Sequence, residues 1–195
     1  MSVGADYWHR PLSGFMRDPL ANYARSAYAC EVNPWTTRGD IEAALFFRGT
    51  IVSAFGHIDV SLSEFAIQCS RLPEYEGIAA SYPYRFEKRL NYLRNVFSRG
   101  PLARSQRIAN LFIDRLEQAY DLRNLCAHGK MQVLPDWGVT LTDFPESSPS
   151  HVVSRRQRYT LKELEIFAFK AARLSRLCMA LLEKLRTQIG LPFSE

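Results

Sequence analysis

The chain has 195 residues and a mass of 22.4 kDa, a size that suits one compact domain with or without an N-terminal appendage. Apolar residues make up 47% and charged residues 23%, a globular balance that excludes disordered and fibrous classes. The net charge of +5 is compatible with a polyanionic partner but does not identify one.

Uninterrupted apolar runs such as residues 43–47 are short, so we expect no membrane span. The first residues contain no apolar signal core, and we therefore expect a cytoplasmic protein.

Residues 1–39 are punctuated by proline and glycine and are predicted to be an irregular extension. Within this extension, Asp18 followed by Pro19 is typical of a helix start. We therefore expect one short helix over residues 19–30.

Apolar residues then recur at three- and four-residue steps in three successive segments, which predicts three helices. The first covers residues 40–72 and ends before Pro73. The second covers residues 86–97. The third covers residues 108–128, with Gly129 placed to close it.

A hairpin is predicted after the third helix. Residues 139–144 alternate between apolar and polar, residues 145–150 suit a loop, and residues 152–159 suit a returning strand. Thr160 and Glu163 have the spacing of a capping box that opens a last helix. That helix is expected to bury one stripe, formed by Leu161, Leu164, Phe167, Ala171, Leu174, Leu177, Leu181 and Leu185.

The predicted fold class is mainly α. It is an antiparallel helical bundle over residues 40–190, with a small β-hairpin at about 131–159 between the last two long helices. The isolated cysteines are predicted to be reduced, buried thiols rather than zinc ligands or disulfides: Cys30, Cys69, Cys126 and Cys178.

Several common catalytic patterns are absent from the sequence. It has no glycine-rich phosphate loop, no H-E-x-x-H pair and no G-x-S-x-G elbow. We therefore expect neither a cofactor nor a metal site.

The segment that ends the third helix carries the strongest candidate site. Asn124 and His128 lie one helical turn apart on the same face, and Arg123 is about 140° from His128 around the axis. A long Arg side chain closes part of that gap, and a second subunit can close the rest. The dipole at the C-terminal end of the helix favours a His128 cation, which suits a residue that takes and gives a proton.

Each of these residues also has a structural interpretation. An Arg near a helix end often caps carbonyl groups, and a His before a closing Gly is usually structural. Cys126 fits a core thiol, and Lys130 fits a solvated charge.

Taken together, Arg123-Asn124-x-x-x-His128 followed by Gly129, on a helix of a bundle, resembles the signature of the HEPN (higher eukaryotes and prokaryotes nucleotide-binding) superfamily. The resemblance covers residues 40–188. It implies a homodimer with a composite RNA-cleaving site at the interface. Many members are metal-independent endoribonucleases that act as toxins paired with antitoxin proteins or as phage-defence effectors.

Carried over by the resemblance, His128 is the general acid or base, Arg123 binds the scissile phosphate, and Asn124 holds His128 or the phosphate. Asp59 and Glu64 are candidates to orient His128. Lys130 occupies the position of a Tyr that receives a nucleotide in one branch of the superfamily, so control by AMPylation is not expected there.

Two other interpretations stay open. One is a non-catalytic HEPN-like module that binds RNA, a nucleotide or a protein partner, because function belongs to the site and not to the fold. The other is an unrelated helical regulator or scaffold in which the Arg–His pair is coincidental.

Overall fold

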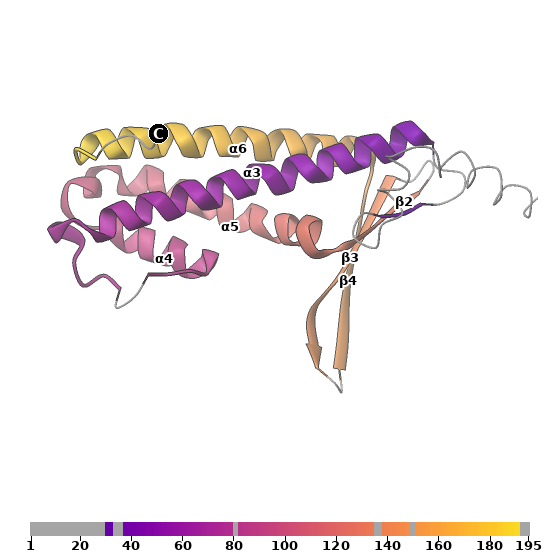
Figure 1. Ribbon diagram of the computed structural model, residues 1–195, viewed down its shortest axis with the longest axis horizontal. Coiled ribbons are helices and arrows are strands. Elements are labelled where there is room, and N and C mark those ends of the chain that lie inside the picture. Colours follow the sequence, from indigo (N-terminus) through magenta and orange to yellow (C-terminus); the bar gives the residue numbers. More distant parts are fainter. Residues whose placement is uncertain (1–29, 33–36, 80–81, 135–137, 149–150, 192–195) are drawn as a thin grey trace, which may run out of the picture. The chain divides into compact units, whose positions relative to one another are not determined.

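The computed structural model describes residues 30–32, 37–79, 82–134, 138–148 and 151–191, which are mainly helical with one small sheet (Figure 1). The mainly α class is therefore confirmed. In chain order the helices and strands are β1 Cys30–Val32, α3 Arg38–Ser70, α4 Phe86–Phe97, α5 Gln106–His128, β2 Lys130–Leu134, β3 Gly138–Ser148, β4 His151–Tyr159 and α6 Leu161–Gln188. Two short 3-10 helices, Pro73–Tyr75 and Gly100–Ser105, lie before and after α4.

The three helices predicted from periodicity are present, and α4 has the predicted bounds. Residues 19–29 of the predicted short helix lie outside the described residues. Cys30 belongs to β1, so the segment 1–39 is not irregular throughout. No sequence pattern indicated this strand, since three residues are too few for a detectable alternation.

The chain divides into two compact units. We call residues 1–52 with 122–169 the sheet unit, and residues 53–121 with 170–195 the helical unit. Helices α3, α5 and α6 each contribute a segment to both units.

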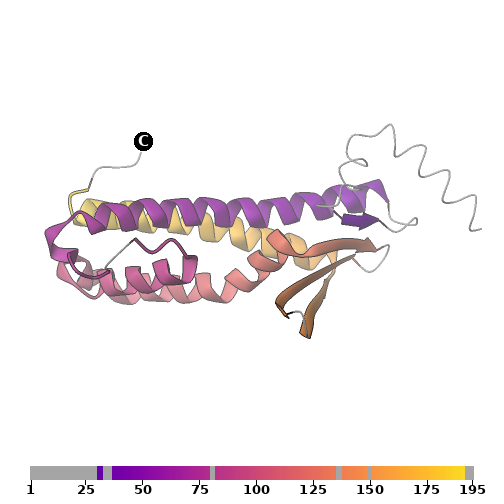
Figure 2. The ribbon, with the colours of Figure 1, turned by 60° about the horizontal axis from the view of Figure 1, so that its bottom comes forward.

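In the ribbon of Figure 2, α4 lies beside α5. Aromatic rings join the helices of the helical unit. The Phe86 ring of α4 stacks on Tyr120 of α5 with 4.0 Å between centroids, and Tyr120 also meets Phe55 of α3 at 6.4 Å. Phe65 of α3 lies 6.1 Å from Phe97 of α4. The core of this unit is thus built around rings from three helices.

Residue pairs between helices give the helix directions, and the parallel pairs correct the predicted antiparallel bundle. The Ser61 hydroxyl of α3 donates to the Met179 sulfur of α6, and Arg186 of α6 donates to the Gln68 side chain of α3. The residue numbers of the two helices rise together along these contacts, so α3 and α6 run parallel. In contrast, α5 runs antiparallel to α4, because Phe86 lies beside Tyr120 while Arg94 pairs with Asp114. The pairs Asp59–Arg89 and Phe65–Phe97 also rise together, so α4 runs parallel to α3, a topology that helical periodicity does not encode.

The sheet has the order β1-β2-β3-β4, with β1 parallel to β2 and the other pairs antiparallel. The predicted hairpin corresponds to β3 and β4. Strand alternation sends four fully buried side chains to the core face of the sheet: Met131, Val133, Val139 and Leu141.

Strand β3 continues through part of the predicted loop at 145–150 and ends at Ser148. The ladder with β4 shifts register between Asp143 and Glu146, which places Pro145 in the irregularity. Proline has no N–H to donate, so a bulge accommodates it without ending the strand.

Helix α6 begins at the predicted capping box. The Glu163 carboxylate accepts the Thr160 backbone N–H at 2.8 Å, and the Thr160 hydroxyl accepts the Glu163 N–H at 3.1 Å. The buried stripe is rotated from the prediction, because Leu177 is 43% exposed. The fully or nearly fully buried positions are Leu164, Ala168, Ala171, Cys178, Leu182 and Leu185.

Within the described residues, one helical segment, Gly39–Ser70 of α3, is long and apolar enough to cross a membrane by length and composition. The expectation drawn from short apolar runs overlooked it, because isolated charges interrupt the runs without making the segment polar. Core helices of soluble proteins meet the same criterion, so the feature is weak evidence.

Thr160→Ala is expected to lower the free energy of unfolding by about 1 kcal/mol, because it removes the side-chain acceptor at the start of α6. Thr160→Ser keeps an acceptor and serves as the control. The measurement is urea denaturation at neutral pH. Equal stability of Thr160→Ala and the wild type would contradict the cap.

The same cap gives a pH dependence. The backbone N–H and the hydroxyl of Thr160 donate to the Glu163 carboxylate and lower its pKa. The stabilisation that the cap gives to the folded state is therefore fully present when the pH is above the ordinary pKa of glutamate. It is lost as the pH falls through the lowered pKa. The difference between wild type and Thr160→Ala is therefore expected to shrink in acid.

Candidate functional site

The Arg–Asn–His motif lies on the last two turns of α5, in the sheet unit. The Arg123 guanidinium donates to Oδ1 of Asn124 at 3.0 Å, and both side chains are half-buried, whereas His128 is exposed. The helix is continuous to His128, so Asn124 and His128 share one face. The contact joins Arg123 to the residue that lies one turn before His128.

The end of α5 is closed by a tight backbone contact. The N–H of Gly129 donates to the carbonyl of Leu125 at 2.9 Å, and a Cβ on Gly129 would lie only 2.3 Å from that oxygen. Gly129 is not among the positive-φ glycines of the described chain, so it closes the helix by close approach and not by a left-handed turn. The left-handed closure is unnecessary because β2 begins at the next residue.

Arg48 of α3 holds the same helix end. Its guanidinium donates to the carbonyl oxygens of Cys126 at 2.6 Å and Gly129 at 3.1 Å. Carbonyl groups in the last turn of a helix lack intrahelical donors, so these bonds satisfy acceptors that would otherwise need water. The sequence analysis missed Arg48, since its partners are 78 and 81 residues away along the chain.

Basic residues lie in register on the polar face of the sheet. In the strand register, Lys130 of β2 lies opposite Thr142 of β3, and Thr142 lies opposite Arg156 of β4. Arg158 of β4 lies opposite Thr140 of β3. Lys130, Arg156 and Arg158 are exposed. We call these three residues the basic row. Because Lys130 follows His128 by two residues, the row starts beside the end of α5.

The other two candidate residues have cationic partners in the helical unit. Asp59 forms an ion pair with Arg89, and the carboxylate of Glu64 lies 3.7 Å from Arg186. Both arginines are nearly fully buried. These contacts give the two carboxylates a structural role, and their action on His128 stays a prediction.

Three thiols have the predicted character. Cys69, Cys126 and Cys178 are free and buried, whereas the Cys30 side chain lies outside the description. Burial raises the pKa of Cys126 to about 11 and that of Cys69 and Cys178 to about 12. Thiols with such pKa values are poor nucleophiles at neutral pH.

The part of the chain that the structure describes contains no group of three or more His, Cys, Asp or Glu side chains arranged to hold a metal ion.

Comparisons with known proteins identify no family: no family model, curated protein or solved structure matches the chain.

Arg48→Met is expected to lower the free energy of unfolding by about 2 kcal/mol, because two carbonyl acceptors lose a charged donor. Amide hydrogen exchange in the last turn of α5 is expected to accelerate. Arg71→Met, at an exposed arginine just after α3, is the charge-matched control with an expected change within about 0.5 kcal/mol. Unchanged stability and exchange in Arg48→Met would show that Arg48 does not hold this end.

Proposed function

We propose that the protein is a metal-independent endoribonuclease of the HEPN type, with its site at the C-terminal end of α5. The observation that carries the proposal is the Arg123–Asn124 contact next to an exposed His128 on a helix end fixed by Gly129 and Arg48. This arrangement offers a phosphate ligand, a polar positioning group and a proton-transfer group together.

The reaction assigned to these groups is transphosphorylation of RNA. The ribose 2′-oxygen attacks phosphorus, its proton passes to one His128 imidazole, and the P–O5′ bond breaks. The leaving 5′-oxygen takes a proton from an imidazolium. The products are a 2′,3′-cyclic phosphate and a 5′-hydroxyl end.

Arg123 would stabilise the extra negative charge on the phosphate. A preorganised donor of this kind contributes about 10²–10³-fold, and a general acid or base about 10²–10⁴-fold. Asn124 accepts one hydrogen bond from the Arg123 guanidinium and lies one helical turn before His128. It is therefore suited to position both the guanidinium and the imidazole.

The chemistry favours a homodimer. Cleavage uses one base and one acid, whereas each chain supplies one His128. A second copy would supply the second imidazole and a second Arg123. The C-terminal end of a helix dipole also disfavours phosphate, so additional positive charge is needed. The basic row provides part of this charge on each chain.

The biological role proposed from the HEPN resemblance is a toxin or phage-defence effector in the cytoplasm, controlled by an antitoxin protein. A non-catalytic module that binds RNA is the alternative outcome of the cleavage test.

Purified wild-type protein is expected to cleave single-stranded RNA in EDTA and to leave cyclic-phosphate ends. His128→Ala and Arg123→Ala are each expected to lower the cleavage rate at least 10²-fold with no loss of fold. His57→Ala, at an exposed histidine of α3, is the matched control and should cleave at the wild-type rate.

Cleavage by His128→Ala at the wild-type rate would overturn the proposed mechanism. A folded wild-type protein that binds RNA without cutting it would support the binding module instead. Mass spectrometry of the 3′ ends distinguishes a cyclic phosphate from the products of a contaminating hydrolase.

Lys130→Met and Arg156→Met are each expected to weaken RNA binding and to reduce the slope of log K against log salt concentration by about 0.7. The physical reason is the loss of one phosphate contact and its released counterion. Lys162→Met is the control, because Lys162 pairs with Glu165 on α6 and is not in the basic row. If Lys130→Met and Arg156→Met had the same salt slope as Lys162→Met, the basic row would not contact the RNA.

A further inference from the structure

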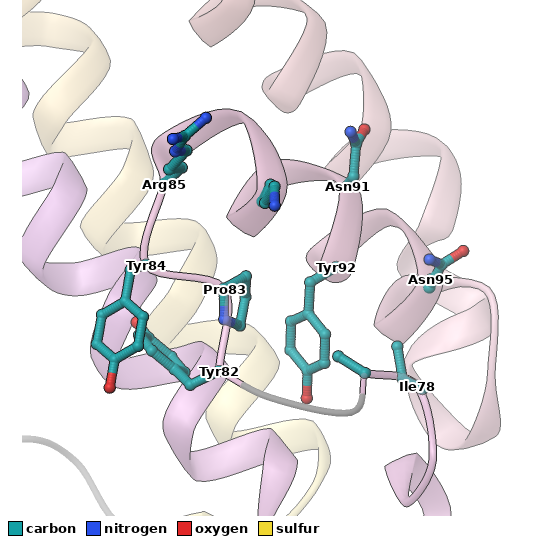
Figure 3. Close-up of a pocket in the computed structure, with 10 residues that line it drawn as sticks. Ile78, Tyr82, Pro83, Tyr84, Arg85, Asn91, Tyr92 and Asn95 are labelled. Atoms are coloured by element: carbon teal, nitrogen blue, oxygen red, sulfur yellow. The ribbon is translucent and has the colours of Figure 1, made fainter.

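A groove lies along one face of α4 in the helical unit, with a cavity volume of about 530 Å³ (Figure 3). Its floor comes from α4 positions spaced at one helical turn, and one wall comes from the segment before α4. The residues used below are Tyr82, Tyr84, Arg85, Lys88, Asn91, Tyr92 and Asn95. The volume is in the range of clefts that hold small organic ligands.

The wall of the groove is held by a buried arginine. Arg89 is only 5% exposed, pairs with Asp59 and donates to the carbonyl of Tyr84 at 2.7 Å. Its guanidinium carbon lies 5.8 Å from the centroid of the Tyr82 ring, and the Tyr82 hydroxyl donates to the Ser63 carbonyl at 3.3 Å. These contacts hold the Tyr82 ring and the backbone of Tyr84 in the wall of the groove.

A buried hydroxyl lines the groove without a partner. Tyr92 is 6% exposed, and its Oη makes no hydrogen bond to any group in the described part of the chain. Figure 3 shows its ring between Pro83 and Ile78. Burial raises the pKa of Tyr92 to about 12, so the phenol is a neutral donor at physiological pH. Among the described residues this buried donor has no acceptor, so an acceptor on a ligand would have to reach it at the inner end of the groove.

One end of the groove is suited to an anion. Arg85 and Lys88 are exposed beside the first turn of α4, and the Arg85 side chain makes no capping bond to this helix start. The first N–H groups of a helix and its dipole favour negative charge. Glu87 lies in the same turn but does not line the groove.

The rest of the groove is suited to a planar ring. Tyr84 is 81% exposed, and its ring stands nearly perpendicular to Tyr82, at 84° with centroids 5.2 Å apart. The exposed Tyr84 ring offers a stacking surface. Asn91 and Asn95, one turn apart on α4, present amides that both donate and accept, as hydrogen bonding to a base edge requires.

We propose that this groove binds one unpaired nucleotide of a single-stranded RNA, with the phosphate toward Arg85 and Lys88 and the base between the tyrosines and the two asparagines. The RNA is the substrate class of the proposed function, on which this inference rests. A free mononucleotide has the same chemistry and is tested as a separate arm.

The test measures binding of a fluorescein-labelled single-stranded decanucleotide by anisotropy, with His128→Ala protein as background so that no RNA is cut. Tyr84→Ala is expected to raise Kd about tenfold through lost stacking. The double variant Arg85→Met with Lys88→Met should raise Kd and lower the salt slope. Tyr92→Phe, which removes only the hydroxyl, should raise Kd several-fold with no change in thermal stability that would account for it.

Arg99→Met removes one positive charge at an exposed residue that does not line the groove, and its Kd should stay within twofold. Folded groove variants that all bind within twofold of the background protein would overturn the inference. Displacement of the RNA by micromolar AMP or UMP would support the groove and assign it a free nucleotide, whereas displacement by RNA alone would assign it the strand.

The two proposals fail separately. Wild-type protein without cleavage activity would overturn the nuclease and leave the binding comparison intact. Equal affinity of all groove variants would overturn the groove and leave cleavage by His128 untouched.

Discussion

The closure of the C-terminal end of α5 is the constraint on which the candidate site depends. A helix that ends inside a protein leaves its last carbonyl groups without donors. Here Arg48 donates to two of them, and Gly129 passes so close to the Leu125 carbonyl that no side chain fits. The chain can therefore enter β2 at once. As a result, His128 is held at the junction of helix and sheet, and Lys130 takes its register opposite Thr142.

Arginine serves two different purposes in this molecule, and burial separates them. Arg89 and Arg186 are nearly fully buried and have carboxylate or amide partners, since a guanidinium taken out of water requires compensation. Arg85 and Arg156 are exposed. The buried arginines fix the backbone around them, as Arg89 does for the wall of the groove on α4. The exposed arginines give the charge that the proposed RNA contacts use.

The proposed chemistry also explains why the surroundings of the motif matter more than its short pattern. His128 alone supplies one proton-transfer group at the unfavourable end of a helix dipole for binding phosphate. Under the proposed function, Arg123, held by Asn124, and the basic row on the sheet would supply the positive charge that binding of RNA needs there. A second copy would complete the pair of imidazoles that cleavage needs.

Local patterns in the sequence determined the helices, the β3–β4 hairpin, the capping box of Thr160 and Glu163, and the spacing of Asn124 and His128, because each depends on residues a few positions apart. The tertiary structure alone decided the parallel course of α3 and α6, the addition of β1, the Arg48 bonds to the end of α5 and the groove built by Arg89. Pro145 is a small example of this difference. The sequence predicted a loop there, but the pairing of β3 with β4 continues past Pro145 through an irregularity in the register. Contacts between residues far apart along the chain depend on topology, and no periodicity in a single sequence records which distant partner a charged or aromatic side chain will meet.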